Sequence, residues 1–425
     1  MHTELLIEKI QKGEMDDRLL DIYVDESRLD YQRKRYVNAM KQFETYYGSD
    51  DVMVFSAPGR SEVGGNHTDH QHGEVLAASI NLDTIGIVKV TSDNKIRVKS
   101  DEYDEVVISL EDITIKPEER ETTTALIKGV VAGFVEREFA VGGLCAYITS
   151  DVLIGAGLSS SAAFETLIGT ILSGLYNDMT VTATEIAIIG QYAENTYFGK
   201  PCGLMDQMAC SVGNLVHIDF ENPKKPKVEK IDVDMEAYGY SLCITDTKGS
   251  HADLTEDYAA VPNEMKLVAN YFQKEVLRDV SVNDIFEKIN NLRELLGDRC
   301  VLRALHFMNE NERVKKEVAA LEQGNFEVFL QQIKASGDSS FKYLQNVYSN
   351  NNVKNQNIAV ALMISDMVLN EKGVSRVHGG GFAGTIQAFV KNESVPAYKK
   401  QMNQFFGEGA CNDLKIRKYG GIKVI

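Results

Sequence analysis

The chain has 425 residues, of which 44% are hydrophobic, and a formal net charge of −17 at pH 7. This hydrophobic fraction supports a folded core, and the length suits two or three domains. The acidic balance argues against nucleic acid or an anionic membrane surface as a partner, because both attract clusters of Lys and Arg. We also expect no membrane-spanning helix, since no apolar run approaches about 18 residues.

The first residues and the cysteines indicate the cellular compartment in which the protein would work. The opening stretch MHTELLIEKIQKGEMDD is acidic and lacks the basic-then-apolar pattern of a secretory signal. Six cysteines are scattered without CxxC spacing, which favours reduced thiols over a disulfide framework or a zinc site. We therefore expect a cytoplasmic enzyme. The sequence leaves the oligomeric state open and is compatible with a monomer.

The first 50 residues predict a helical lead-in. Tyr36, Met40, Phe43 and Tyr47 share one helical face, and Gly48 is placed to end that helix. Short β-like runs separated by polar turns then follow over residues 85–110.

Between these segments, residues 56–81 read SAPGRSEVGGNHTDHQHGEVLAASIN. Polar residues crowd the thirteen positions 60–72, among them Arg60, Glu62, Asn66, His67, Asp69, His70 and His72. Such a turn suits a sugar, whose hydroxyls need directional donors and acceptors. A metal site is an alternative, although HTDHQH lacks the i, i+4 histidine spacing of a helical site and has no cysteine nearby. A solvated polar loop is the other alternative.

A glycine-serine loop, DVLIGAGLSSSAA at residues 151–163, separates a strand-like run from a helical run beginning near Phe164. Residues 155–161 should therefore lie at a helix N-terminus, where free N–H groups and the helix dipole favour an anion. The loop is not a Walker A motif, because it has no Gly-Lys-Ser/Thr. It indicates either a nucleotide kinase of another type or a Gly/Ser turn that caps a helix.

Two carboxylates follow this loop. Thr182 and Glu185 fit a capping box that opens a helix through about Tyr197. Glu194, near the end of that helix, would then either reach a metal or be a surface glutamate. Asp206 follows a Pro-Cys-Gly turn, and there a carboxylate either accepts a proton from a substrate hydroxyl or caps a helix.

The second half begins with the best linker candidate, ENPKKPK at 221–227, which divides the chain into residues 1–220 and 221–425. Residues 262–372 predict mostly helix, and 375–390 predict a strand, a glycine loop and a strand. Strands and helices mix without a regular βαβ repeat, which favours an α+β fold with two lobes.

Taken in order, four stretches resemble the galactokinases of the GHMP small-molecule kinase superfamily. They are APGR…HTD…G, GAGLSSSAA, PCGLMDQ and HGGGFAG, and they span Ser56 to Val390. The resemblance implies an ATP-dependent sugar 1-kinase that uses Mg²⁺ and a small sugar. It also implies a ribosomal S5 domain 2-like N-terminal lobe, a ferredoxin-like C-terminal lobe and an active site between them.

The resemblance also implies residue roles. Asp206 matches the catalytic base, Arg60 matches the arginine that orients it, and Ser161 and Glu194 match the Mg²⁺ ligands. The ATP phosphate loop would comprise Gly155, Ala156, Gly157, Leu158, Ser159, Ser160 and Ser161. The sugar ligands would comprise Glu62, Asn66, His67, Thr68, Asp69 and Tyr258.

The sequence departs from the common pattern G-R-x-N-[LI]-I-G-E-H-x-D-Y at Glu62, Asn66 and His70. Compared with this pattern, the amide has become Glu62 and the acid has become Asn66, as if the two had exchanged places. The resemblance implies that the family glutamate at position 66 holds the C6 hydroxyl of the sugar. A neutral Asn66 would tolerate a C6 carboxylate that a glutamate would repel, although Glu62 restores an acidic group nearby. We therefore expect a galactokinase. The alternatives are a related 1-kinase for galacturonate, N-acetylgalactosamine or arabinose, and a non-catalytic galactose sensor, against which the complete phosphate loop argues. The chain also has no Trp for an adenine pocket.

Overall fold

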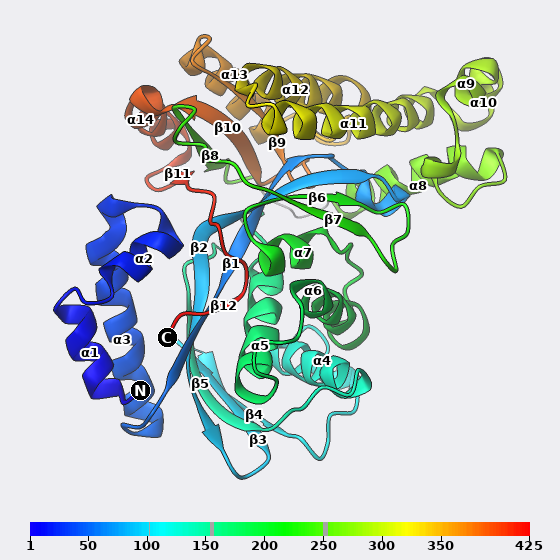
Figure 1. Ribbon diagram of the computed structural model, residues 1–425. Helices are drawn as coiled ribbons and strands as arrows, with labels where there is room; N and C mark the ends of the chain where they lie inside the picture. Colours follow the sequence, from blue (N-terminus) through cyan, green and yellow to red (C-terminus); the bar gives the residue numbers. More distant parts are fainter. Residues whose placement is uncertain (102, 154–156, 250–253) are drawn as a thin grey trace.

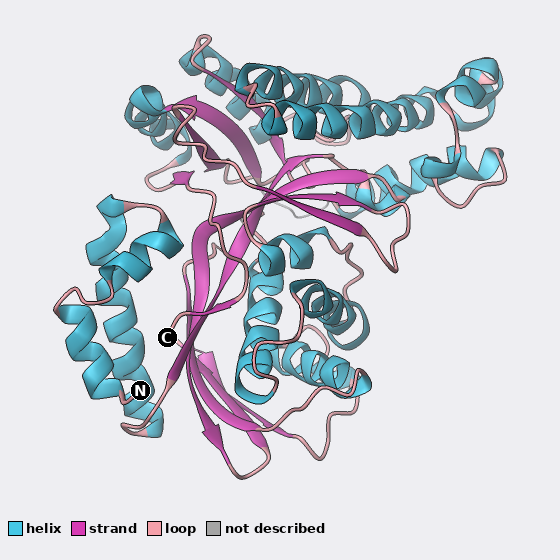
Figure 2. Cartoon of the chain, viewed as in Figure 1, coloured by secondary structure: helices cyan, strands magenta, loops and turns pink. Residues whose placement is uncertain are grey.

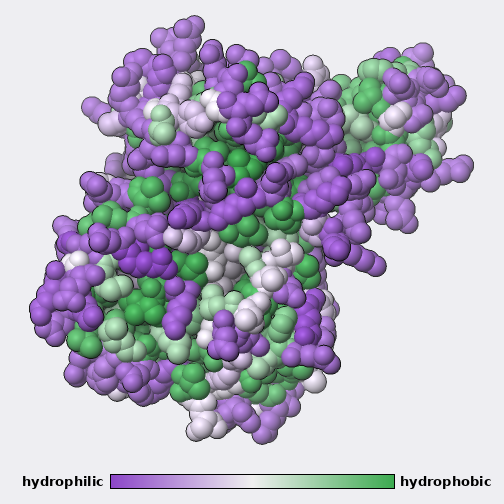
Figure 3. Space-filling model, in the orientation of Figure 1, coloured by the Kyte–Doolittle hydropathy of each residue, from purple (hydrophilic) through white to green (hydrophobic). Residues whose placement is uncertain are grey.

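Two β-sheets and their covering helices organise the chain (Figures 1 and 2). The computed structural model describes residues 1–101, 103–153, 157–249 and 254–425. Among these residues, no helix combines the length and the apolar character needed to cross a bilayer. Hydrophilic residues cover most of the face in Figure 3, with hydrophobic residues in smaller groups between them.

The helical lead-in is confirmed and lies against one face of the larger sheet (Figure 1). It consists of α1 (Thr3–Gln11), α2 (Asp16–Tyr23), a 3₁₀ turn (Glu26–Arg28) and α3 (Leu29–Tyr47). The predicted face of α3 buries Tyr36, Met40 and Phe43, and the helix ends at Gly48 with φ 76°. These side chains pack on strand residues such as Val54 and Ile85.

The larger sheet has eight strands in the described residues. Their bounds are β1 (Met53–Gly64), β2 (Glu74–Thr91), β3 (Lys95–Ser100), β4 (Tyr103–Ser109), β5 (Gly143–Ser150), β6 (Leu215–Asp219), β7 (Lys227–Ile231) and β12 (Ile422–Lys423). The order is β12-β1-β2-β5-β3-β4, with β6 between β2 and β7, and only β3–β5 is parallel. The strands expected over 85–110 are confirmed. Since β7 and β12 lie beyond residue 220, this sheet draws on both sides of the proposed domain boundary, which stays a prediction.

Four helices cover the other face of this sheet (Figure 1). They are α4 (Thr123–Glu136), α5 (Ser160–Tyr176), α6 (Ala183–Tyr192) and α7 (Met205–Val212). The capping box of Thr182 and Glu185 is confirmed, and it starts α6. Beyond Tyr192 the chain continues as a short π-helix over Ala193–Phe198. The helical segment therefore extends to the predicted end near Tyr197, but its last turns are π-helical rather than α-helical.

The smaller sheet is antiparallel and has the order β11-β8-β10-β9. Its strands are β8 (Tyr240–Asp246), β9 (Gly373–His378), β10 (Thr385–Lys391) and β11 (Cys411–Leu414). The accompanying helices are α8 (Thr255–Tyr271), α9 (Val282–Glu287), α10 (Ile289–Leu296), α11 (Asp298–Glu322), α12 (Phe326–Ser339), the π-helix Ser340–Leu344, α13 (Asn357–Leu369) and α14 (Val395–Phe406). Both the helical stretch and the strand–glycine loop–strand unit are confirmed.

A buried ionic cluster ties three distant segments together. Asp83 of β2 accepts from Arg35 of α3 at 2.6 Å and from Arg417 of the C-terminal tail at 2.9 Å. Asp83 and Arg417 are fully buried. Burial alone would raise the pKa of the Asp83 carboxyl, but the two guanidinium groups hold the pKa below its usual range.

We expect Asp83→Asn to lower the free energy of unfolding by about 3–5 kcal/mol, because the buried Arg417 loses its carboxylate partner. Arg35 loses one of two carboxylate partners and keeps Asp151 at 3.3 Å. The lowered pKa means that the contribution of Asp83 is present above the usual carboxyl pKa of about 3.9 and is lost as the pH falls through the folded value. Urea unfolding measures both effects. Asp30→Asn, in the exposed pair with Arg33, is the control and should leave the midpoint unchanged. Equal midpoints for the two variants would contradict the role of the cluster.

Candidate active site

Strand β1 places Arg60 beside the predicted phosphate loop, residues 155–161. The β1–β2 register shifts between Pro58 and Arg60, and a bulge of this kind redirects side chains. A Cβ on Gly59 would lie 2.8 Å from the carbonyl oxygen of Leu158, so only glycine allows the loop to pack this closely on the strand. The Arg60 backbone N–H donates to Leu158 O at 3.1 Å, and its guanidinium donates to Gly157 O at 2.5 Å. Strand and loop are therefore fixed to each other.

Asp206 lies in the first turn of α7 and meets Arg60. Arg60 Nε donates to Asp206 Oδ1 at 2.8 Å, and Ser159 Oγ donates to Oδ2 at 2.5 Å. The Arg60 side chain is 8% exposed and that of Asp206 is 34% exposed. Burial opposes ionisation, yet Arg60 and the hydrogen bonds from Arg60 and Ser159 hold the pKa of Asp206 below its usual value. The arrangement presents an ionised, accessible carboxylate that can accept a proton.

The phosphate loop leads into α5, as its position at a helix N-terminus predicted. Gly157 and Ser159 adopt positive φ values of 68° and 56°, and α5 begins at Ser160, where the first backbone N–H groups have no partner within the helix. Gly155 and Ala156 lie outside the described residues. Ser160 and Ser161 line a cavity of about 1070 Å³. Apolar walls of this cavity include Val98, Leu126, Ile148 and Phe164.

Ser161 and Glu194 lie together beside this loop. Ser161 Oγ donates to Glu194 Oε1 at 3.2 Å, and Lys200 Nζ lies 3.4 Å from the same oxygen. Neighbouring oxygens of an octahedral Mg²⁺ shell, with bonds of 2.0–2.1 Å, are about 3 Å apart. The residues therefore fit Mg²⁺ as two hard oxygen ligands. Since no group of three His, Cys, Asp or Glu among the described residues forms a metal cage, the ion would also need phosphate or water oxygens.

Sequence reasoning missed two residues behind Glu194. Gln207 Nε2 donates to Glu194 Oε2 at 2.8 Å and to Glu165 Oε2 at 3.1 Å. Glu165 is fully buried, and its burial, with Glu194 nearby, raises its pKa well above the usual value. Gln207 follows Asp206 directly, and Glu165 lies one helical turn after Ser161, so spacing alone could have identified both.

Three predicted sugar ligands surround the glycine loop and the turn before Asp206. His67 Nε2 lies 3.0 Å from Gly380 O, and Tyr258 OH donates to Gly381 O at 2.7 Å. A Cβ on Gly203 would lie 2.2 Å from Asp69 Oδ2, which places Asp69 against that turn. Burial lowers the pKa of His67 to about 4 and raises that of Tyr258 to about 12, so both are neutral at pH 7. All three are partly exposed.

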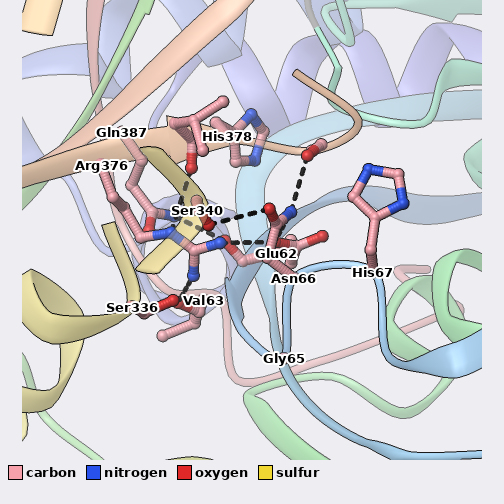
Figure 4. Close-up of polar contacts among 12 residues, drawn as sticks. Glu62, Val63, Gly65, Asn66, His67, Ser336, Ser340, Arg376, His378 and Gln387 are labelled. Atoms are coloured by element: carbon pink, nitrogen blue, oxygen red, sulfur yellow. Dashed lines mark hydrogen bonds and ion pairs between the residues drawn. The ribbon is translucent and has the colours of Figure 1, made fainter. Parts of the chain in front are cut away.

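The other three predicted sugar ligands are buried. Glu62, Asn66 and Thr68 are 4%, 0% and 0% exposed. Figure 4 shows Glu62 and Asn66 among Arg376 and Ser340, with His67 apart from them. The Thr68 hydroxyl lies 2.8 Å from Gly65 O and 2.7 Å from Glu74 O, inside its own turn. Sugar binding by these three side chains stays a prediction, and their burial argues against it.

The glycine loop also contacts the phosphate loop. His378 Nδ1 lies 2.9 Å from Thr385 Oγ1, and its Nε2 lies 3.1 Å from Ser61 Oγ. A Cβ on Gly157 would come within 3.3 Å of His378 Nδ1. The smaller sheet and the phosphate loop therefore meet directly at the strand that carries Arg60.

Two family models match the segments that build this site. The galactokinase galactose-binding signature matches residues 41–90, and the N-terminal domain of GHMP kinases matches residues 125–214. The first covers β1 and the polar turn, and the second covers the phosphate loop, Glu194 and Asp206.

Solved structures share the fold. Galactokinase of Lactococcus lactis complexed with galactose is 24% identical, with a TM-score of 0.74, over 90% of this chain and 98% of that chain. Mevalonate kinase of Methanococcus jannaschii is 17% identical, with a TM-score of 0.61, over 86% and 98%. They confirm the predicted two-lobed α+β kinase fold. The chain thus shares the fold of these kinases, with a match to the N-terminal domain of GHMP kinases over residues 125–214 and to the galactokinase galactose-binding signature over residues 41–90.

Proposed function

We propose that the chain is a galactokinase, which transfers the γ-phosphoryl group of ATP to the C1 hydroxyl of α-D-galactose. The observation that carries the proposal is the Asp206 carboxylate, partly exposed and held by Arg60 and Ser159 beside the phosphate loop. The galactose-binding signature over 41–90 supports the choice of sugar.

In the proposed reaction, Asp206 accepts the proton of the C1 hydroxyl as that oxygen attacks the γ-phosphorus. The new bond joins the C1 oxygen to phosphorus, and the bond from the γ-phosphorus to the β–γ bridging oxygen breaks. Arg60 keeps Asp206 oriented and offsets negative charge on the moving group. Phosphoryl transfer depends mainly on such positioning and charge stabilisation.

The phosphate loop and the cavity beside it would hold ATP. Backbone N–H groups at the start of α5 would bind the phosphates, and the apolar walls would hold the base. Ser161 and Glu194 would hold Mg²⁺, which when bound offsets phosphate charge. Gln207 keeps the Glu194 carboxylate turned toward Ser161.

His67, Asp69 and Tyr258 are the proposed ligands of the sugar hydroxyls. The Asp69 carboxylate can accept from two hydroxyls, and the neutral His67 ring offers one donor and one acceptor. Each belongs to a segment that also touches the glycine loop or the turn before Asp206. The C1 hydroxyl would thereby be directed toward the base.

The second candidate, which the Glu62/Asn66 departure from the family pattern raised in the sequence, is a sugar 1-kinase that acts on galacturonate, N-acetylgalactosamine or arabinose. A coupled ADP-release assay with Mg²⁺-ATP separates the candidates across these sugars, galactose and glucose. The highest kcat/KM on galactose supports the main proposal, and preference for another sugar replaces it with the second. Binding of galactose and ATP without ADP release would instead support a non-catalytic sensor.

Asp206→Asn should keep the shape of the site but remove the base. We expect kcat to fall about 10²–10⁴-fold, the usual contribution of a positioned base. Steady-state kinetics at saturating sugar and ATP measure the change, and Asp30→Asn, on the surface, is the matched control. If Asp206→Asn retains more than a tenth of kcat, Asp206 is not the base.

Ser161→Ala removes one proposed Mg²⁺ ligand. We expect KM for Mg²⁺-ATP to rise about tenfold while the sugar dissociation constant stays unchanged, because Ser161 faces the nucleotide cavity. Titration calorimetry with galactose and kinetics with varied Mg²⁺-ATP give the two values. Equal loss of both affinities would indicate a structural role.

Ser159→Ala tests the control of the Asp206 pKa. Ser159 donates to Asp206 Oδ2 and so favours the ionised form, and its removal should raise the pKa of Asp206. The acidic limb of kcat/KM for the sugar, measured at saturating ATP, should therefore move to higher pH. A limb that stays in place would mean that Arg60 alone sets the ionisation of Asp206.

A further inference from the structure

Three successive carbonyls of the glycine loop are each held by a side chain from another segment. Gly379 O accepts from Asn66 Nδ2 at 2.8 Å, and Gly381 O accepts from Tyr258 OH at 2.7 Å. Between them, Gly380 O lies 3.0 Å from His67 Nε2 and accepts from Asn346 Nδ2 at 3.2 Å. Since glycines have no side chains of their own to pack, these bonds fix the path of the loop.

The Asn66 amide has all its hydrogen-bonding groups in use (Figure 4). Besides Gly379 O, Nδ2 donates to Glu62 Oε1 at 3.0 Å. Oδ1 accepts from Ser340 Oγ at 3.1 Å and from Asn346 Nδ2 at 2.9 Å. A side-chain amide has two N–H donors and two acceptor lone pairs, so a sugar hydroxyl could bind only by displacing one of these partners.

Arg376 fixes which end of the Asn66 amide faces Glu62. Its Nη2 donates to Glu62 Oε1 at 2.7 Å, and its Nη1 donates to Val63 O at 2.5 Å. Arg376 is fully buried, so Glu62 is its ionic partner in an interior where a lone charge is costly. The Glu62 oxygen then accepts from the amide nitrogen of Asn66, which turns Oδ1 toward Ser340 and Asn346.

An amide suits position 66 better than an acid. The Nδ2 end faces two acceptors, the Glu62 carboxylate and Gly379 O. A glutamate or aspartate at position 66 would place carboxylate oxygens, which only accept, against the Glu62 carboxylate and Gly379 O, which also accept. It would also add a second negative charge beside Glu62. The acid–amide exchange in this chain is therefore explained by the contacts of the two side chains with each other and with the loop.

We propose that Asn66 and Glu62 are positioning residues that fasten the glycine loop, and that neither binds the C6 group of the sugar. The inference rests on the proposed sugar-kinase function. His67 and Tyr258, the proposed sugar ligands, are attached to the same loop, so Asn66 acts on the sugar through them. It follows that the identity of residue 66 does not set selectivity at C6.

The test compares galactose with 6-deoxygalactose, which lacks only the C6 oxygen, in the wild type and in Asn66→Ala. If Asn66 has a positioning role, Asn66→Ala lowers kcat/KM for both sugars by the same factor, about 10- to 100-fold, because the loop and the sugar ligands attached to it are displaced together. The ratio between the two sugars stays within about threefold of the wild-type ratio. Where turnover of 6-deoxygalactose is too slow, its competitive inhibition constant gives the same comparison. A direct ligand of the C6 oxygen would lose galactose selectively, so a ratio that falls tenfold or more would overturn the proposal.

Amide hydrogen exchange of residues 379–383 gives a second readout that does not need activity. Exchange should accelerate in Asn66→Ala and, less strongly, in Ser340→Ala, which removes one donor to Asn66 Oδ1. Asn309→Ala is the matched control, because Asn309 bonds within its own helix and is exposed. Unchanged exchange in Asn66→Ala would overturn the proposal. A wild type that phosphorylates no sugar would overturn the kinase function instead, and exchange would still decide the role of Asn66.

Discussion

Strand β1 is the element on which the rest of the structure depends, because it carries four polar side chains through the interior. Ser56, Arg60, Ser61 and Glu62 are all buried. Burial of such groups is costly unless each finds a partner. The partners come from the C-terminal tail, α7 and the two hairpin strands of the smaller sheet: Arg417, Asp206, Gln387 and Arg376. Pairing the buried polar groups of β1 therefore brings the predicted phosphate loop, the candidate base and the smaller sheet together.

The same physics gives two neighbouring carboxylates different ionisation. Burial opposes the charge on both, but Asp206 has Arg60 in contact and its pKa falls. Glu165 has Glu194 beside it, and its pKa rises. Asp206 is thus suited to accept a proton, whereas Glu165 gives up its proton less readily and shares the amide of Gln207 with Glu194. Environment, rather than residue type, distinguishes the two roles.

The proposed sugar site depends on backbone as much as on side chains. Asn66, His67 and Tyr258 converge on three consecutive glycine carbonyls, and His378 links the same loop to Ser61 of β1. A residue that never touches substrate can therefore change the position of those that do. This is a physical reason for a polar turn to hold both exposed and fully buried groups.

The sequence by itself determined the elements whose causes are local. Apolar spacing, the Thr182–Glu185 cap and glycine placement predicted α3, α5, α6 and the β9–β10 unit, and the ordered motifs predicted the kinase fold. Only the tertiary structure decided that Glu62, Asn66 and Thr68 are buried, that Gln207 joins Glu165 to Glu194, and that β7 and β12 complete the larger sheet. These outcomes rest on partners far along the chain, such as Arg376, 314 residues from Glu62, and Asn346, 280 residues from Asn66. The exposure of a side chain and the number of its hydrogen bonds depend on which distant groups the fold brings to it. The local sequence pattern does not contain that information.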